Sequence, residues 1–337
     1  MKRVGRFVGV GLLVLVLVLL AAISLTIGWK PILGPRARAL TDRKFAASPE
    51  RLARGSYLAN AVMGCTDCHS EHDWKAPGGP PVAARLGAGE VFPERDLPGS
   101  VIAPNLTPDR ETGAGNWSDD QLARAIREGI GYDGRALFPL MPYQNFRALS
   151  DEDLASVIVY LRSLPPVRNP LPRTRIDFPV RYLMRNAPDP VTTPVPAENS
   201  PDPIKRGEYI ARMAHCNDCH TPKQHGQPNE ALAFAGGAGF HGPFGTVTSA
   251  NITPDASGIA YYDEAAFISA LRTGKVGARN LNPLMRWIAM RALTDDDLRA
   301  MFAYLRTLKP IAHRVDNTEP PTFCKICQGK HGGGDKN

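Results

Sequence analysis

The pattern of apolar and polar positions separates an apolar N-terminal run from a longer part with helical periodicity. Residues 7–28 form a run of 22 residues without charge, rich in Leu and Val, after Lys2, Arg3 and Arg6. As a helix this run would be about 33 Å long, against about 30 Å for the hydrocarbon core of a bilayer. It exceeds the apolar core of a cleavable signal peptide, and no clear small-residue cleavage site follows it. We therefore expect residues 1–30 to be an uncleaved transmembrane signal anchor.

The rest of the chain contains an internal repeat whose segments return in the same order. The matching segments are 54–57 and 206–209, 65–69 and 216–220, 105–109 and 251–255, 139–141 and 283–285, 149–154 and 293–298, and 160–162 and 304–306. The offset falls from 152 to 144 residues, so the second copy is slightly shorter. The repeat predicts two tandem domains, at residues 48–165 and 203–312.

Each copy is predicted to form three helices joined by long irregular segments. The first helix should run into a cysteine motif, and the second and third should begin at polar caps followed by acidic or amide residues. The expected starts are Pro49, Ser118 and Ser150 in the first copy and Pro203, Asp263 and Thr294 in the second. No alternating strand pattern appears. The expected fold class is therefore mainly α.

Residues 166–202 separate the two copies and are rich in proline. Eleven of the 31 prolines lie between positions 165 and 203. Proline resists helix and favours extended polyproline segments. We expect a semi-rigid linker that holds the domains apart or side by side, without one shared core.

The charge distribution argues against a nucleic-acid-binding protein. The 337 residues carry a formal net charge of +7, which falls to +3 beyond the first thirty residues, and no basic cluster is present. Residues 50–164 are net −5 and residues 203–310 are net +3. This difference would let the two domains dock different partners, although solvated faces without a functional role explain it equally well.

Two Cys-x-x-Cys-His motifs carry the chemistry. Their residues are Cys65, Cys68 and His69 in the first copy and Cys216, Cys219 and His220 in the second. The spacing lets two thiols capture both vinyl groups of a haem while the histidine reaches the iron. A thioredoxin-type pair needs no following histidine, and a zinc site would bring both pairs together, whereas these lie 151 residues apart in separate repeats. The motifs predict two covalently bound haem c groups.

The sixth iron ligand should come from the opposite face of each haem and should exist in both copies. Of eight methionines, only Met141 and Met285 align with each other, each after Pro-Leu and ahead of the last helix. A thioether opposite histidine raises the potential of haem. We expect these methionines to be the axial partners of His69 and His220, with core packing as the alternative. Surface or local hydrogen-bonding roles are expected for His72, His215, His225, His241, His313 and His331.

Each copy resembles a class I cytochrome c domain, and the whole resembles membrane-anchored dihaem cytochromes c, especially the cytochrome subunits of periplasmic membrane-bound dehydrogenases. The two haem motifs, the Asn-[Leu/Ile]-Thr-Pro-Asp segments, the Pro-Leu-Met segments and the Tyr-Leu-Arg helices carry the resemblance. In that family the first and last helices of a domain cross closely, which would explain Gly55 and Gly207, with Tyr160 and Tyr304 as partners. The resemblance also implies that the haem domains lie in the periplasm, at the inner membrane.

The tail at residues 313–337 departs from the three-haem members of that family. Cys324 and Cys327 form a third Cys-x-x-Cys, but Gln328 stands where the proximal histidine would be. A disulfide or free thiol pair is the main expectation. A metal site that includes His331 and a third haem are the alternatives.

The predicted function is one-electron transfer, because histidine and methionine fill both axial positions and leave no catalytic residue at the iron. The protein would relay electrons from a dehydrogenase or other donor to a respiratory acceptor, such as an oxidase or another cytochrome. The alternative is a dihaem enzyme of the peroxidase or thiosulfate dehydrogenase type. Its open haem would be the second, because Arg286 and Trp287 replace Pro142 and Tyr143 after the methionine.

Overall fold

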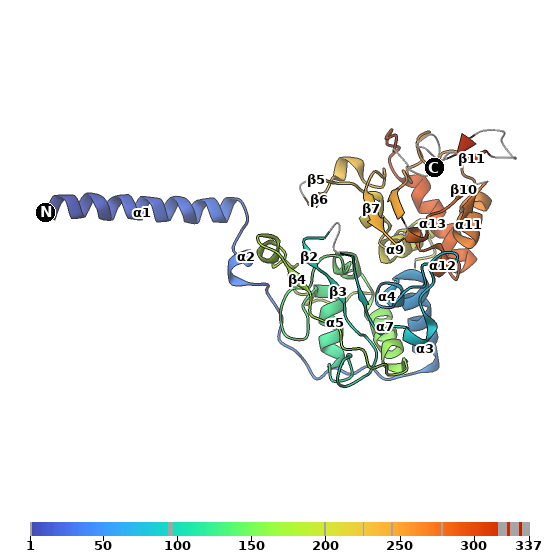
Figure 1. Ribbon diagram of the computed structural model, residues 1–337, viewed down its shortest axis with the longest axis horizontal. Coiled ribbons are helices and arrows are strands. Elements are labelled where there is room, and N and C mark those ends of the chain that lie inside the picture. The colour runs from blue at the N-terminus through green and yellow to red at the C-terminus, as the bar shows by residue number, and fades with distance from the viewer. Residues whose placement is uncertain are drawn as a thin grey trace.

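The computed structural model describes residues 2–93, 97–198, 200–224, 226–243, 245–277 and 279–315, together with 322–323 and 330–331. Helix α1 (Lys2–Leu25) projects from the rest of the molecule as a single long rod (Figure 1). Its segment Arg3–Leu25 reaches a mean hydropathy of 3.0 and is not buried inside the protein. By length and composition, α1 can cross a membrane.

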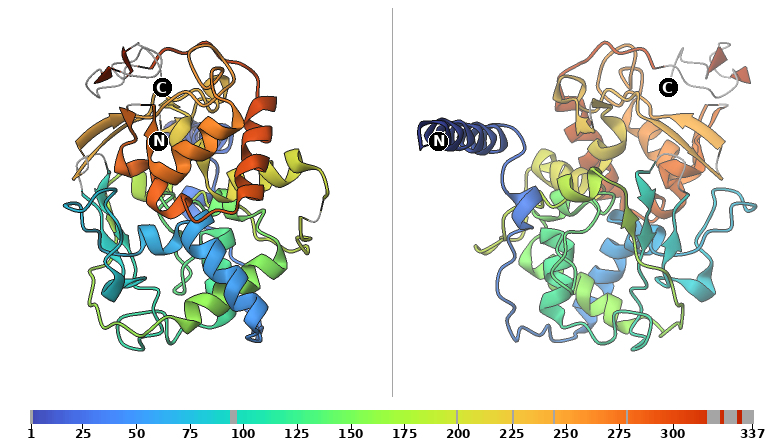
Figure 2. Two further views of the ribbon diagram at one scale, coloured as in Figure 1. Left: turned by 90° about the vertical axis from the view of Figure 1, so that its right-hand side faces the viewer. Right: turned by 60° about the vertical axis from the view of Figure 1, so that its left-hand side comes forward.

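Two sets of helices follow in the same order, one for each copy of the repeat, and we call these copies domain 1 and domain 2 (Figures 1 and 2). Domain 1 contains α3 (Pro49–Tyr57), the π-helical turn η1 (Leu58–Val62), α4 (Cys65–Cys68), the 3-10 turn η2 (Ala83–Arg85), α5 (Asp119–Glu128), α6 (Tyr143–Phe146) and α7 (Asp151–Ser163). Domain 2 contains α9 (Pro203–Met213), α10 (Cys216–His220), the 3-10 turns η4 (Glu230–Leu232) and η5 (Pro283–Met285), α11 (Glu264–Thr273), α12 (Trp287–Met290) and α13 (Asp295–Thr307). The predicted caps form: Ser118, Ser150, Asp263 and Thr294 each accept a backbone N–H bond. The mainly helical fold class is confirmed.

Short antiparallel strand pairs, which the sequence pattern did not predict, fasten the irregular segments. The pairs are β1 (Glu90–Val91) with β3 (Ile102–Ala103), β2 (Gly99–Ser100) with β4 (Arg175–Ile176), β5 (Lys223–Gln224) with β6 (Gln227–Pro228), β7 (Gly239–Gly242) with β8 (Gly245–Thr248), β9 (Lys275–Val276) with β10 (Arg279–Asn280), and β11 (Thr322–Phe323) with β12 (Lys330–His331). Each strand has two to four residues. Such strands are too short for an alternating pattern to stand out.

The first and last helices of each domain cross at a glycine, as the family resemblance implies. A Cβ atom at Gly55 would lie 1.9 Å from the backbone oxygen of Ser156 in α7. At Gly207 it would lie 1.9 Å from the backbone oxygen of Ala300 in α13. The Cβ atoms of Tyr160 and Tyr304 are the next side-chain neighbours. Any larger side chain would push the two helices apart.

The proline-rich segment that links the two domains is attached to one of them. It lies along domain 1, where β4 pairs with β2 and the Val195 carbonyl oxygen accepts a hydrogen bond from the Asp151 N–H at 2.9 Å. Helix α8 (Val180–Leu183) packs on α2 (Lys30–Leu33). Extended proline-rich backbone can separate two domains or lie along one of them. Here the contacts with domain 1 hold the segment against that domain.

The prediction that the domains share no core is wrong. Buried apolar side chains of both domains form one contiguous cluster. Reciprocal tyrosines cross the interface: the hydroxyl of Tyr209 donates to Asp153 at 2.7 Å, and that of Tyr57 donates to Asp297. Contacts that recur in both directions are typical of an interface between two similar units related by a two-fold axis.

Candidate functional site

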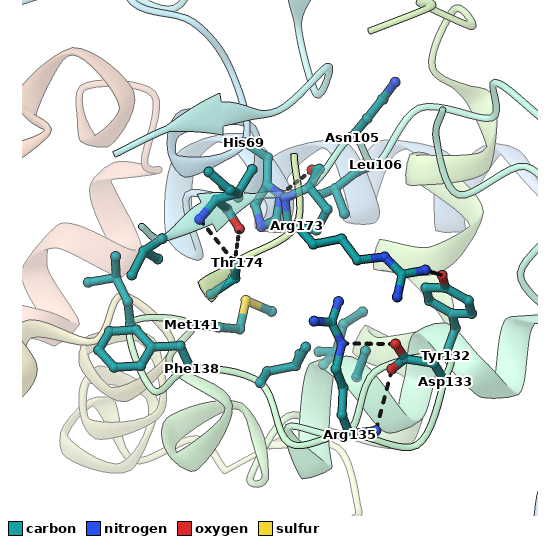
Figure 3. A pocket seen from close by; sticks show the side chains of 18 of the residues that line it. His69, Asn105, Leu106, Tyr132, Asp133, Arg135, Phe138, Met141, Arg173 and Thr174 are labelled. Atoms are coloured by element: carbon teal, nitrogen blue, oxygen red, sulfur yellow. Dashed lines mark hydrogen bonds and ion pairs between the residues drawn. The ribbon is translucent and has the colours of Figure 1, made fainter. Parts of the chain in front are cut away.

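A cavity of about 1320 Å³ lies in domain 1 beside the first cysteine motif. His69 and Met141 point into it from opposite sides (Figure 3). Cys65 and Cys68 line the same cavity. The structure therefore brings together the four residues that the sequence predicted for the first haem.

His69 is held so that one ring nitrogen remains available to a metal. Its Nδ1 atom donates a hydrogen bond to the Pro104 carbonyl oxygen at 2.7 Å. Burial lowers the pKa of His69 to about 4 against the smaller opposing effect of this bond, so the imidazole is neutral at physiological pH. A neutral imidazole fixed at Nδ1 presents the lone pair of Nε2, which is the arrangement of an iron ligand.

Burial keeps the cysteines of this site protonated. It raises the pKa of Cys65 to about 12 and that of Cys68 to about 11. Among the described residues there is no cluster of three or more His, Cys, Asp or Glu that could hold a metal ion, and the described cysteines form no disulfide.

Positively charged side chains line one edge of the cavity (Figure 3). The Arg173 guanidinium donates to the Tyr132 hydroxyl at 3.1 Å, and the Arg135 Nε lies 2.9 Å from Asp133. Guanidinium groups match carboxylates in geometry and charge. This edge suits the carboxylate substituents of a haem.

Domain 2 repeats the histidine geometry of domain 1. The Nδ1 atom of His220 donates to the Ala250 carbonyl oxygen at 2.7 Å, and burial lowers the pKa of His220. Burial also raises the pKa of Cys216 to about 12 and that of Cys219 to about 11. Met285 ends the turn η5 and is partly buried against the shared core.

The repeated Asn-x-Thr-Pro-Asp segment supports the carbonyl group that holds each histidine. The Asn105 side chain accepts from the Thr107 N–H at 2.9 Å and donates to the Val167 carbonyl oxygen at 2.7 Å. Asn251 makes the matching bonds in domain 2. The segment thus ties the loop next to Pro104 or Ala250 to the chain beyond the last helix.

The aromatic residues that follow the two methionines occupy equivalent places despite their different identities. Tyr143 packs on Gly129 at the end of α5, where a Cβ atom would lie 2.7 Å from the ring. Trp287 packs in the same way on Gly274 at the end of α11. Each aromatic follows its methionine by two residues, so the exchange of Tyr for Trp preserves the support of the methionine loop.

Arg286 links the two cysteine motifs across the domain interface. Its Nε atom donates to Asp67 at 2.7 Å, and its Nη1 atom donates to the Nε2 atom of His215 at 3.2 Å. Burial and the charge of Arg286 lower the pKa of His215 to about 3, so this ring stays a neutral acceptor. The guanidinium fills the space beside Gly64, where a Cβ atom would lie 2.1 Å from it. One side chain of domain 2 therefore contacts the first haem motif and the residue that directly precedes the second.

A reciprocal contact holds the second motif. The Asn145 side chain donates to Asp218 at 2.9 Å, so the aspartate inside each motif is bound by the segment after the opposite domain's methionine. His215 also lines the cavity of domain 1 and lies 6.4 Å from the Phe146 ring. His215 therefore has a hydrogen-bonding role, as expected, but it acts across the domain interface and neither locally nor on the surface. The only sequence signal for this interface was the return of Asp67 as Asp218 in a motif whose chemistry does not need an acid.

Comparison with known families decides the nature of the repeat. The family model described as Cytochrome c matches residues 52–165 and again residues 204–309. This chain belongs to the cytochrome c family. The cytochrome carries two covalently bound haem c groups, one for each match, and the prediction of two haems is confirmed. The donor set in domain 1, with a neutral imidazole opposite a thioether, fits such a group.

Relatives of this cytochrome include subunits of dehydrogenases. It is 31% identical to the fructose dehydrogenase cytochrome subunit of Gluconobacter japonicus, over 82% of this chain and 56% of that protein. It is 29% identical to the gluconate 2-dehydrogenase cytochrome c subunit of Pantoea cypripedii, over 78% of this chain and 60% of that one. A dihaem c-type cytochrome of Cereibacter sphaeroides is 27% identical, over 79% of this chain and 89% of its own length. The cytochrome is an electron carrier, as predicted.

The cytochrome spans a little over half of the two dehydrogenase subunits named above. The predictions for Cys324 and Cys327 lie outside the described residues, as does the side chain of His331. Residues 322–323 and 330–331 pair as β11 and β12 on either side of these cysteines.

Proposed function

We propose that each domain binds one haem c between a histidine and a methionine. The proposed axial ligands are His69 and Met141 in the domain at residues 48–165, and His220 and Met285 in the domain at residues 203–312. The proposed thioether bonds come from Cys65, Cys68, Cys216 and Cys219. The observation that carries this proposal is the opposition of His69 and Met141 across one cavity.

When bound, haem iron would supply the redox chemistry, because it changes between its ferrous and ferric states by losing or gaining one electron. The two histidines and two methionines proposed above would hold each iron from both sides and would leave no place for a substrate at the metal. Contacts of Arg286 with Asp67 and His215 connect the two domains next to their motifs in one unit. We infer that an electron received by one domain passes to the other within this unit.

We further propose that α1 anchors the cytochrome in the inner membrane with both domains in the periplasm. A dehydrogenase subunit is the proposed donor, in keeping with the relatives named above, and a respiratory oxidase or another cytochrome is the proposed acceptor. The net charges of −5 and +3 in the two domains support separate docking of donor and acceptor.

A redox titration of the full-length holoprotein, with and without cyanide, tests the proposed ligation. We expect two one-electron steps, a methionine-to-iron charge-transfer band from both haems, and no binding of cyanide to the ferric protein. Cyanide binding at one haem would overturn the carrier role of that domain and favour the enzymatic alternative.

Electron flow in membranes tests the proposed partners. Membranes with the cytochrome should pass electrons from a sugar or sugar-acid substrate to oxygen, and both haems should become reduced on the way. Membranes from a deletion strain should keep dehydrogenase activity with an artificial acceptor but lose oxygen consumption. Unchanged oxygen consumption in the deletion strain would contradict the proposed place between the dehydrogenase and its acceptor.

A further inference from the structure

A small apolar surface lies next to the end of α1. Helices α2 and α8 pack together there. With their flanking residues they expose six large apolar side chains, which we call the shelf: Trp29, Ile32, Leu33, Phe178, Tyr182 and Leu183. Each is between 37% and 79% exposed. After Leu33, the other exposed large apolar side chains of the described residues are isolated from one another in the sequence, whereas Phe178, Tyr182 and Leu183 lie within six residues on the segment that packs on α2.

The opposite side of the two short helices is fixed to domain 1. Pro31 is buried, and Met184 packs against a buried cluster that includes Ala187. The Lys30 ammonium donates to the Ala187 carbonyl oxygen at 3.1 Å, and the Arg185 guanidinium donates to the Pro31 carbonyl oxygen at 3.4 Å. The outward side chains of the shelf are therefore held in place from behind.

Chain geometry puts the shelf at the level of the lipid headgroups, provided that α1 spans a bilayer as in the proposed function. The 23 residues of Arg3–Leu25 extend about 35 Å as a helix, slightly more than the hydrocarbon core of about 30 Å. Only residues 26–28 separate Leu25 from Trp29, so the shelf begins within about 14 Å of the end of the helix. Figure 1 shows α2 between α1 and the body of domain 1.

Cations surround the shelf in excess over acids. Its four cations are Lys30, Arg36, Arg181 and Arg185, and its two acids are Asp177 and Asp189. Asp189 pairs with Lys30 at 2.9 Å, and the guanidinium groups of Arg181 and Arg185 lie 5.0 Å and 4.8 Å from the centre of the Tyr182 ring. Aromatic rings flanked by basic side chains are typical of the membrane–water interface, where the ring enters the lipid and the cation meets phosphate.

We propose that the shelf is a second membrane contact, and that its occupant is a phospholipid bilayer with anionic headgroups. The back of the shelf forms part of the wall of the domain 1 cavity, which Leu33, Met184 and Arg185 line. Contact with the bilayer holds this cavity at the membrane side, with α11, α12 and α13 of domain 2 farther from α1 (Figure 1).

Photo-crosslinking to lipid tests this contact in the full-length holoprotein, reconstituted in nanodiscs of phosphatidylcholine and phosphatidylglycerol. The photoreactive residue p-benzoylphenylalanine replaces one residue at a time: Leu13 in the anchor, Phe178 or Leu183 in the shelf, and Tyr261 in domain 2. Leu183 and Tyr261 form a matched pair, because each is 46% exposed. We expect lipid adducts at positions 13, 178 and 183, with at least tenfold less adduct at position 261.

The anchor position separates two kinds of failure. Adducts at position 13 without adducts at 178 and 183 would overturn the shelf contact and leave the anchor intact. Absence of adducts at position 13 would overturn the anchor, and adducts at 178 would then show that the shelf binds lipid by itself. Equal adducts at 183 and 261, or crosslinks from 178 to a second copy of the chain, would also overturn the proposal.

Charge reversal tests the choice of anionic headgroups. The double variant Arg36→Glu with Arg181→Glu should lower the lipid adduct at position 178 severalfold in the nanodiscs that contain phosphatidylglycerol. Arg299→Glu, at another exposed arginine, in α13, should leave the adduct unchanged. Equal yields for all three proteins would overturn the role of anionic lipid.

Discussion

The two haem domains keep the same support for their ligands but differ in the residue that follows the axial methionine. In domain 1 this residue is Pro142, which lies in the wall of its own cavity. In domain 2 it is Arg286, which leaves its own domain and binds Asp67 of the other. The histidine bonds, the glycine crossing and the aromatic after the methionine are the same in both. Positions that fix a ligand are thus retained between the copies, as are the interface tyrosines Tyr57 and Tyr209, whereas the residue directly after the methionine has diverged.

A second difference lies at the start of the second helix of each domain. Residues 34–48 connect α2 to α3 and pass around the outside of domain 1, and we call them the strap (Figure 1). Asp120 in α5 is fully buried beneath the strap. The Arg38 guanidinium makes two bonds of 2.7 Å to this carboxylate. The equivalent position in domain 2 is Ala265, which is exposed. Only domain 1 has such a strap among the described residues.

Among the tests of this comparison, substitution of the proposed axial methionines should give the largest effect, which is a change in the potential of one haem. Met141→His and Met285→His should each lower the potential of one haem by on the order of 100 mV, because axial ligands set haem potentials over a range of about 0.8 V. Each variant should also remove about half of the methionine-to-iron band. A redox titration followed by optical spectroscopy measures both effects.

The variant in domain 2 is the more informative of the pair. If Met285→His leaves the band and both potentials unchanged, then another residue ligates the second iron and the two sites differ in kind. The matching variant in domain 1 shows how large a change to expect.

Removal of the Arg286 side-chain charge should affect both domains at once. Arg286→Gln leaves the largely buried Asp67 without its ionic partner, which should cost about 3 kcal/mol of unfolding free energy. It also removes a positive charge beside both motifs, which favours the ferric state and lowers both potentials. Asp67→Asn should raise the potentials instead. Urea unfolding and redox titration measure the two effects.

The double variant completes the cycle for this pair. Arg286→Gln with Asp67→Asn should recover most of the lost stability and return the potentials toward those of the natural protein, because neither group then stays unpaired. Potentials that do not move in any of the three variants would show that the ion pair only holds the domains together.

Substitution of the crossing glycines should affect the two domains alike. Gly55→Ala and Gly207→Ala each force a Cβ atom against a backbone oxygen, at a cost of about 3 kcal/mol, the upper end of overpacking effects. Urea unfolding followed at the haem absorbance measures this cost. Tolerance of alanine at one site alone would show that the crossings are less similar than the structure indicates.

The sequence predicted the features that depend on spacing within one copy or on identity between copies. Cys65, Cys68 and His69 stand in a motif of five residues, and Met141 was found because Met285 aligns with it. The helix caps at Ser118 and Ser150 depend on the next three residues only. Each of these features follows from a few neighbouring positions, so a reading along the chain can find them.

The sequence did not predict the features that depend on contacts between distant segments. The partners of Arg286 are 219 and 71 residues away, and no periodic pattern connects them. A proline-rich segment can separate two domains or lie against one of them with the same proline content. The sequence therefore did not predict the path of residues 166–202. Tyr57 and Tyr209 lie in repeated segments, but nothing in one copy shows that each hydroxyl binds an aspartate of the other domain.

The smallest expected effect is the response of the domain 1 strap to acid. Burial opposes ionisation of Asp120, but bonds from Arg38 and the Thr41 N–H outweigh it and lower the pKa from 3.8 to about 2. A carboxylate with a lowered pKa stabilises the fold above its unfolded pKa, and this contribution disappears as the pH falls from about 4 to about 2. The shift corresponds to about 2 kcal/mol.

The comparison of the natural protein with Asp120→Asn isolates this contribution. Acid also affects the haem ligands, but it does so equally in both proteins, so the difference between their unfolding free energies reports the strap alone. That difference should be about 2 kcal/mol at pH 6 and should approach zero at pH 2. If the difference in unfolding free energy stayed constant over this range, the Asp120 hydrogen bonds would stabilise the fold without any contribution from the charge of the carboxylate. The strap would then be no more sensitive to pH than the uncovered helix α11 of domain 2.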